Sequence, residues 1–86
     1  MARPERAIDP AAGPVGQFAC ALRELRRQAG CPTYREMQAV SSVSYSSLSR
    51  AAAGRRLPTW HVTRGFVLAC GGDLDDWRSR WEASRE

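Results

Sequence analysis

The stretch from residue 33 to residue 58, TYREMQAVSSVSYSSLSRAAAGRRLP, constrains the fold most, because it marks both ends of two short helices. Thr33 can cap the first helix, with Glu36 three residues later at the spacing of a capping box. Ser44 is placed to cap a second helix, which Gly54 ends. Helical spacing predicts that the apolar side chains of this stretch face inward: Met37, Val40, Val43, Leu48 and Ala51. The stretch therefore predicts helices over 33–40 and 44–53, joined by a tight serine-rich turn.

A long helix is predicted before this pair, over residues 14–29. A proline stands in its first turn, and Gly30 follows as a left-handed stop. Its apolar residues recur at helical spacing and form one stripe: Val15, Phe18, Ala19, Leu22 and Leu25.

Two more helices are predicted after the pair. The first runs over 59–70 from a threonine cap to a Gly-Gly stop, and the second begins at Asp73 with three aspartates near its positive end. Trp77 and Trp81 share the inner stripe of the last helix and are expected to close it onto the bundle. No segment alternates with a period of two. The predicted fold class is all-α, a compact five-helix bundle.

With 86 residues the chain is predicted to be one domain. We place a flexible N-terminal arm at 1–13, the helical domain at 14–82 and a C-terminal tail at 83–86. No run approaches the roughly 18 apolar residues of a membrane span, and the N-terminus lacks the apolar core of a signal peptide. The expected location is the cytoplasm, with no membrane partner.

Cysteine and histidine usage argues against catalytic or metal chemistry. Cys20, Cys31 and Cys70 are widely spaced and include no C-x-x-C pair, so we expect buried, reduced thiols rather than a disulfide or zinc site. His61 has no acid or nucleophile at motif spacing. We expect no catalytic residue, metal, cofactor or small-molecule substrate, and therefore no enzyme.

Positive charge is concentrated in the body of the chain. All 13 basic residues are arginine. Residues 14–72 hold eight arginines against two acids, a net charge of +6, whereas residues 73–86 hold three arginines against five acids, a net charge of −2. This asymmetry fits a polyanion-binding face, but it also fits arginine-rich solvated surface.

The stretch Leu22 to Pro58 resembles the XRE family of helix-turn-helix domains, the fold of phage Cro and repressor proteins. The matching residues are Thr33, Glu36, Val43, Ser44, Leu48, Ser49, Arg50, Gly54, Arg55, Arg56 and Pro58. The segment LPTWHVTRGFVLACGGDLDDWRSRW is similar to an actinobacterial branch of that family. Two features depart from the pattern. Ser42 replaces the usual turn glycine, which requires either a left-handed serine or a slightly different turn. Ala51 to Ala53 leave Arg50 as the only long basic side chain on the second helix of the pair.

The resemblance implies contacts with double-stranded DNA. The implied base-reading residues are Tyr45, Ser46, Ser49 and Arg50, and a guanidinium at Arg50 can bond both O6 and N7 of guanine. The implied phosphate contacts are Thr33, Tyr34, Arg35, Ser44, Ser47, Arg55 and Arg56. Thr33 and Tyr34 are expected to offer hydroxyls and free amides to an anion.

Two functions remain open at this point. The first is sequence-specific DNA binding by a transcriptional regulator or by the N-terminal module of one, as a homodimer or within a longer parent chain. The second is a protein interaction module that keeps the fold without binding DNA, with the smooth Ala-Ser helix packed against a partner. In the second case the arginine face would meet an acidic partner. For Arg50 alone, the alternative to a DNA contact is a structural pairing with Glu36 or a solvated side chain.

Overall fold

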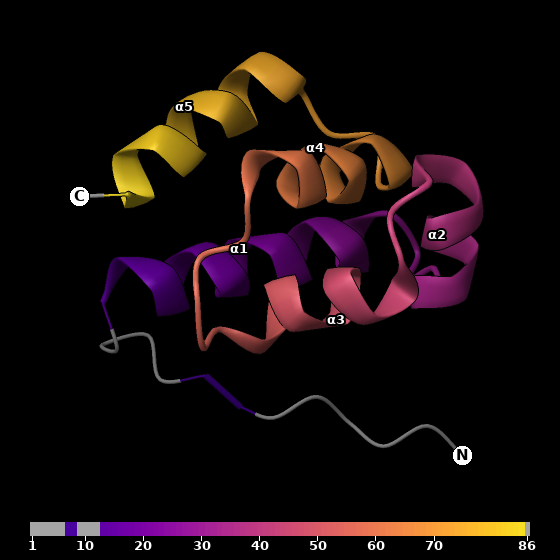
Figure 1. The fold of residues 1–86 in the computed structure, drawn as a ribbon, viewed down its shortest axis with the longest axis horizontal. Helices are drawn as coiled ribbons and strands as arrows, with labels where there is room; N and C mark the ends of the chain where they lie inside the picture. Colours follow the sequence, from indigo (N-terminus) through magenta and orange to yellow (C-terminus); the bar gives the residue numbers. More distant parts are fainter. Residues whose placement is uncertain (1–6, 9–12, 86) are drawn as a thin grey trace.

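Five helices follow one another along the described chain, which comprises residues 7, 8 and 13–85 of this computed structural model (Figure 1). They are α1 (Pro14–Gln28), α2 (Tyr34–Ser41), α3 (Tyr45–Ala53), α4 (Trp60–Ala69) and α5 (Leu74–Ser84). No strand occurs within these residues. The predicted all-α class is therefore confirmed.

Four helices start one residue later than predicted, because the capping residue itself has an extended backbone. The ψ angles are 157° at Thr33, 144° at Ser44, 162° at Thr59 and 116° at Asp73. In each case the side-chain oxygen of the cap accepts a hydrogen bond from the backbone N–H three residues later. These short polar caps satisfy amides that have no partner within the helix.

Helix α4 lies at the centre of the bundle and packs against the other four helices. Figure 1 shows α1 and α3 side by side, α2 at one end of the bundle, and α5 across α4 on the side away from α3. Helix α5 packs on α4 and α1 and makes no contact with α3. One side of α3 is therefore left without a covering helix.

The core draws on all five helices and on the turn between α2 and α3. Its buried members are Phe18, Leu22, Met37, Val43, Leu48, Ala51, Ala52, Phe66, Val67 and Trp77. Trp77 meets Phe18 edge to face, with ring centroids 5.6 Å apart, so α5 closes onto α1 as predicted. Trp81 is half-buried and lies against Trp60.

Val40 was predicted to face inward, and that prediction is wrong, because its side chain is 70% exposed. The inner stripe of α2 is formed by Tyr34, Met37 and Ser41, at positions i, i+3 and i+7. Val40 precedes Ser41 by one residue, which rotates it about 100° around the helix and away from α4.

The cysteines are free thiols, as predicted, but they are not all buried. Cys31 is exposed, and Cys20 and Cys70 are half-buried. Cys31 lies in the loop after α1, with a φ of +55°. Burial raises the pKa of the Cys70 thiol.

The predicted domain boundaries can be compared with the structure at both ends of the helical domain. Helix α5 continues to Ser84, two residues beyond the predicted end of the helical domain at residue 82. Most of the predicted N-terminal arm, including Arg3 and Arg6, lies outside the described residues. Ile8, which is described, is half-buried and packs close to Gly54.

Candidate nucleic-acid interface

The α2–α3 pair is held by local hydrogen bonds at both helix starts. The backbone N–H of Thr33 donates to Glu36 Oε1 at 2.8 Å, and the N–H of Glu36 donates to Thr33 Oγ1 at 3.1 Å. The predicted capping box is thus confirmed. Ser42 has the left-handed conformation that its position requires, with φ +62° and ψ 16°. The chain can therefore reverse between the helices without a glycine.

The buried side chain of Val43 seats the turn against α4. A Cβ atom at Gly65 would lie 2.5 Å from Val43 Cγ2 and 3.3 Å from Ser41 Cβ. The lack of a side chain at Gly65 is therefore what lets the turn approach α4 this closely. The turn from which α3 starts is therefore packed directly on α4.

Helix α3 presents an uncovered face. Tyr45 is 44% exposed, Ser49 and Arg50 are exposed, and Ser46 is half-buried. Within the described residues Arg50 has no hydrogen-bond or ion-pair partner, and the alternative pairing with Glu36 does not occur. Had these side chains been covered by the protein's own helices, contact with a DNA groove would have been excluded.

The start of α3 is tied to α2. The backbone N–H of Tyr45 donates to Gln38 Oε1 at 2.7 Å. The guanidinium of Arg35 lies 4.6 Å from the centroid of the Tyr45 ring, a cation–π distance. These two contacts restrict the direction of the Tyr45 side chain. Sequence reasoning missed Gln38, whose seven-residue spacing from Tyr45 matches no local motif.

The serines at the start of α3 bond to one another. Ser44 Oγ accepts the N–H of Ser47 at 3.2 Å, and its hydroxyl is 2.9 Å from Ser47 Oγ and 3.3 Å from Ser46 Oγ. Each hydroxyl has one proton and two lone pairs. The cluster therefore keeps capacity to bond a ligand, in directions set by its internal bonds.

The N-terminus of α2 differs from the expectation of a free anion site. The amide of Thr33 is occupied by the Glu36 carboxylate, and hydrogen bonds from the Thr33 backbone and side chain lower the pKa of Glu36. A carboxylate therefore stays ionised where a phosphate was expected, and it would repel one. The half-buried Tyr34 packs its ring towards Phe66, under the guanidinium of Arg26 at 4.4 Å. The Thr33 hydroxyl and the exposed Arg35 remain the better phosphate ligands on this side.

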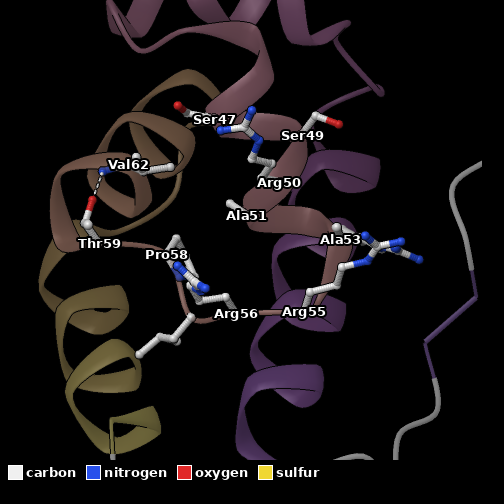
Figure 2. Close-up of a pocket in the computed structure, with 12 residues that line it drawn as sticks. Ser47, Ser49, Arg50, Ala51, Ala53, Arg55, Arg56, Pro58, Thr59 and Val62 are labelled. Carbon is white, nitrogen blue, oxygen red and sulfur yellow. Dashed lines mark hydrogen bonds between the residues drawn. The ribbon is translucent and has the colours of Figure 1, made fainter.

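A groove of about 570 Å³ runs between the second half of α3, the α3–α4 loop and the start of α4. In Figure 2, Ser47 and Arg50 project from α3, Arg55 and Arg56 extend from the loop, and Thr59 and Val62 lie at the start of α4. The residues lining it are Arg23, Ser47, Ser49, Arg50, Ala51, Ala53, Arg55, Arg56, Leu57, Pro58, Thr59 and Val62.

Arg23 and Thr59 are the polar lining residues of this groove that sequence reasoning did not assign to the site. Arg23 Nε donates to the carbonyl of Ala52 at 2.7 Å, so an α1 side chain satisfies one of the last carbonyls of α3. The contact spans 29 residues, and no local pattern signals it. Thr59 was recognisable as a helix cap, but only the packing of α4 beside α3 brings it to the groove.

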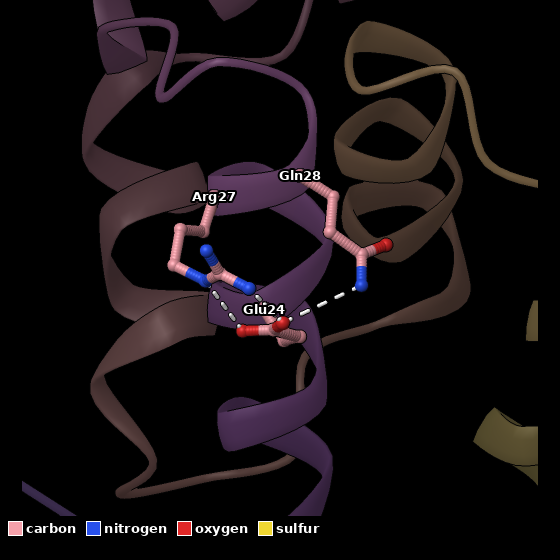
Figure 3. A network of polar contacts seen from close by, with 3 residues as sticks. All are labelled: Glu24, Arg27 and Gln28. Atoms are coloured by element: carbon pink, nitrogen blue, oxygen red, sulfur yellow. Dashed lines mark hydrogen bonds and ion pairs between the residues drawn. The ribbon is translucent and has the colours of Figure 1, made fainter.

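The other two arginines of α1, Arg26 and Arg27, are engaged locally. Arg27 forms an ion pair with Glu24, with its Nε 2.8 Å from Glu24 Oε2, and Gln28 also reaches that carboxylate (Figure 3). The hydrogen bond from Arg27 lowers the pKa of Glu24. Arg26 donates to the carbonyl of Pro32 at 2.7 Å. The exposed arginines of the body without such bonds to described residues are Arg35, Arg50, Arg55, Arg56 and Arg64.

Two of the three alanines at the C-terminal end of α3 are covered by this chain itself. Ala51 and Ala52 are 2% and 0% exposed and belong to the core of this chain. The argument for a protein interaction module from a smooth alanine-rich helix therefore fails at these two positions.

Among the residues that the structure describes, no cluster of His, Cys, Asp and Glu is suited to a metal ion, and no helix is long and apolar enough to cross a membrane.

Comparison with known proteins places the fold in a family. No curated protein and no solved structure matches the chain. A family model described as a helix-turn-helix domain matches residues 17–81, which include all of α2, α3 and α4 and most of α1 and α5. Its extent agrees with the bundle that seats the α2–α3 pair on α4. The chain belongs to this family of helix-turn-helix domains.

Proposed function

We propose that the protein binds double-stranded DNA sequence-specifically through α3, as a transcriptional regulator or as the DNA-binding module of one. The observation that carries the proposal is the uncovered face of α3, with Arg50 unpaired among the described residues. An α-helix fits the major groove, where each base pair presents a distinct pattern of donors and acceptors. Tyr45, Ser46, Ser49 and Arg50 are the proposed base-reading residues.

Phosphate contacts are proposed on both sides of α3. Arg35 lies on α2 at one side, and Arg55 and Arg56 follow α3 at the other. Thr33, Tyr34, Ser44 and Ser47 complete the proposed set, with Thr33 acting through its hydroxyl alone. A protein that neutralises about four phosphates should show a log–log dependence of affinity on salt with a slope near −4.

One domain of this size makes few contacts. Helix-turn-helix proteins gain affinity by binding two half-sites about one DNA turn apart as dimers. We therefore propose that the protein binds its site as a homodimer or as part of a longer parent chain. The family match and the arginines on and beside α3, namely Arg35, Arg50, Arg55 and Arg56, support a regulatory protein of the phage-repressor type.

Selection from a random duplex pool, followed by fluorescence anisotropy with the enriched duplex, tests this proposal. Arg50→Ala should weaken binding by about 1–3 kcal/mol and relax the preference at one G·C pair. Arg80→Ala is the matched control, because it removes the same charge from α5, which does not touch α3.

Two results would contradict the proposal. One is a pool that yields no enriched motif at low salt. The other is an Arg50→Ala variant that binds the enriched duplex as tightly, and with the same base preference, as the wild type.

A further inference from the structure

The last helix of the domain is bonded to the loop that follows α3. The indole Nε1–H of Trp81, on α5, donates to the carbonyl of Pro58 at 2.8 Å. The bond is partly buried and joins residues 23 positions apart. It is notable because α5 makes no contact with α3 itself. Through this bond α5 touches the segment that carries Arg55 and Arg56.

The ring of Trp81 is held in place by aromatic and cation–π contacts. Its ring lies 5.8 Å from that of Trp60, which begins α4. The guanidinium groups of Arg78 and Arg85 lie 5.2 Å and 5.0 Å from the centroid of the Trp81 ring. An indole has a single N–H to donate, and here that donor is directed at the loop.

The α3–α4 loop is restrained at both ends. At its start, Gly54 ends α3 with φ +82°, and the neighbouring Ala52 carbonyl is bonded by Arg23. At its end, Thr59 caps α4, and the preceding Pro58 carbonyl is bonded by Trp81. Arg55 and Arg56 lie between these two restraints. Both arginine side chains are exposed, so the positions that they can reach are limited by the restraints at the two ends of the loop.

We infer that Trp81 is a positioning residue for the DNA interface: its indole N–H holds the Pro58 carbonyl and thereby orders the loop that presents Arg55 and Arg56 to phosphate. The inference rests on the proposed function. A loop that is ordered before binding loses less conformational entropy when it meets its ligand. Trp81 therefore increases affinity without touching DNA.

Trp81→Phe tests the inference, because it keeps an aromatic ring against Trp60 and removes only the indole and its donor. Trp60→Phe is the matched control in the same aromatic cluster, since the indole of Trp60 makes no hydrogen bond with the described residues. All measurements are made well below the unfolding temperature of each variant, so that loss of global stability does not enter the comparison.

Two readouts are compared between the variants. The first is the backbone ¹⁵N order parameter of residues 55–57 in the free protein, which should fall in Trp81→Phe towards the flexible range below about 0.6 and stay unchanged in Trp60→Phe. The second is the dissociation constant for the duplex enriched from the random pool. It should rise about two- to twelve-fold in Trp81→Phe, the factor that corresponds to one net hydrogen bond, with an unchanged salt slope.

The outcomes separate this inference from the proposed function. A wild-type protein that binds no duplex overturns the proposed function, and with it the role of Trp81 at a DNA interface. A wild-type protein that binds a duplex, together with a Trp81→Phe variant whose loop order or affinity equals that of the wild type, overturns the inference alone. An equal loss of affinity in Trp60→Phe also overturns it, because general packing of the aromatic cluster would then be responsible.

Discussion

Replacing Gly65 by alanine tests the contact that seats the α2–α3 turn on α4. In an open helix, Gly→Ala stabilises by about 1 kcal/mol, because alanine has the higher helix propensity. Here the new Cβ would lie 2.5 Å from Val43 Cγ2, closer than two carbon atoms can approach. Val43 is 4% exposed and β-branched, so it has little freedom to move aside. Overpacking of this kind costs about 1–3 kcal/mol, and we take the upper value, about 3 kcal/mol.

The expected net effect of Gly65→Ala is a destabilisation of about 2 kcal/mol, the overpacking cost less the gain in helix propensity. Urea unfolding followed by circular dichroism measures it. For a domain of this size it corresponds to a fall in melting temperature of roughly 10 °C. Because the clash would push α3 outward, binding to the enriched duplex should weaken as well.

A double-mutant cycle with Val43→Ala identifies the cause. Val43→Ala alone should cost about 2 kcal/mol through lost burial and a small cavity. If the clash is the origin, the double variant should be more stable than the sum of the single effects by about 2–3 kcal/mol. A Gly65→Ala variant that is more stable than the wild type, or two effects that add within about 0.5 kcal/mol, would refute the reasoning.

Three further predictions concern the loop glycines, the α2 cap and the loop arginines. Gly54→Ala should lower the free energy of unfolding by about 1–3 kcal/mol, and by more than Gly30→Ala does. Both positions have a positive φ, but of the two only a Cβ at Gly54 meets a neighbour, at 2.9 Å. Equal losses of stability in urea unfolding would show that backbone strain alone matters. Hydrogen bonds from the backbone and side chain of Thr33 lower the folded-state pKa of Glu36 below its ordinary 4.5. The contribution of ionised Glu36 to the stability of the fold is therefore full above pH 4.5, and it is lost as the pH falls through the folded-state pKa. The stability gap between the wild type and Glu36→Ala should therefore narrow in acid, whereas the gap between Glu36→Gln and Glu36→Ala should not, and a gap constant from pH 7 to pH 3 would contradict this. Arg55→Ala combined with Arg56→Ala should make the salt slope of DNA binding shallower by about 2, as measured by anisotropy between low and moderate salt, and an unchanged slope would remove both residues from the phosphate set.

Local signals in the sequence were sufficient to predict the helices and their caps. Thr33, Ser44, Thr59 and Asp73 each cap a helix in the structure, as predicted. A capping interaction spans three or four residues, so its chemistry can be read from adjacent letters. A left-handed serine was one of two ways in which the turn could form without its usual glycine, and Ser42 adopts it.

The same local reasoning failed where packing decides exposure. Val40 and Met37 are both apolar and three residues apart, yet only Met37 is buried, because the position of α4 determines which side of α2 is covered. Thr33 and Glu36 were each recognised, but their mutual bonds occupy the amide that had been expected to bind an anion. The sequence identifies groups that could bind a phosphate more readily than it shows whether those groups are already occupied by other residues.

The sequence by itself determined that this chain is a five-helix domain with a helix-turn-helix pair, because helical period, caps and stops are encoded within a few residues. Only the tertiary structure decided which glycine admits the turn, which arginine caps α3, and which tryptophan reaches the loop. The contacts Gly65–Val43, Arg23–Ala52 and Trp81–Pro58 join residues 22 to 29 positions apart. Each contact depends on how closely two separate segments of the bundle approach one another. The distance between those segments follows from the packing of the whole core rather than from any short stretch of the chain.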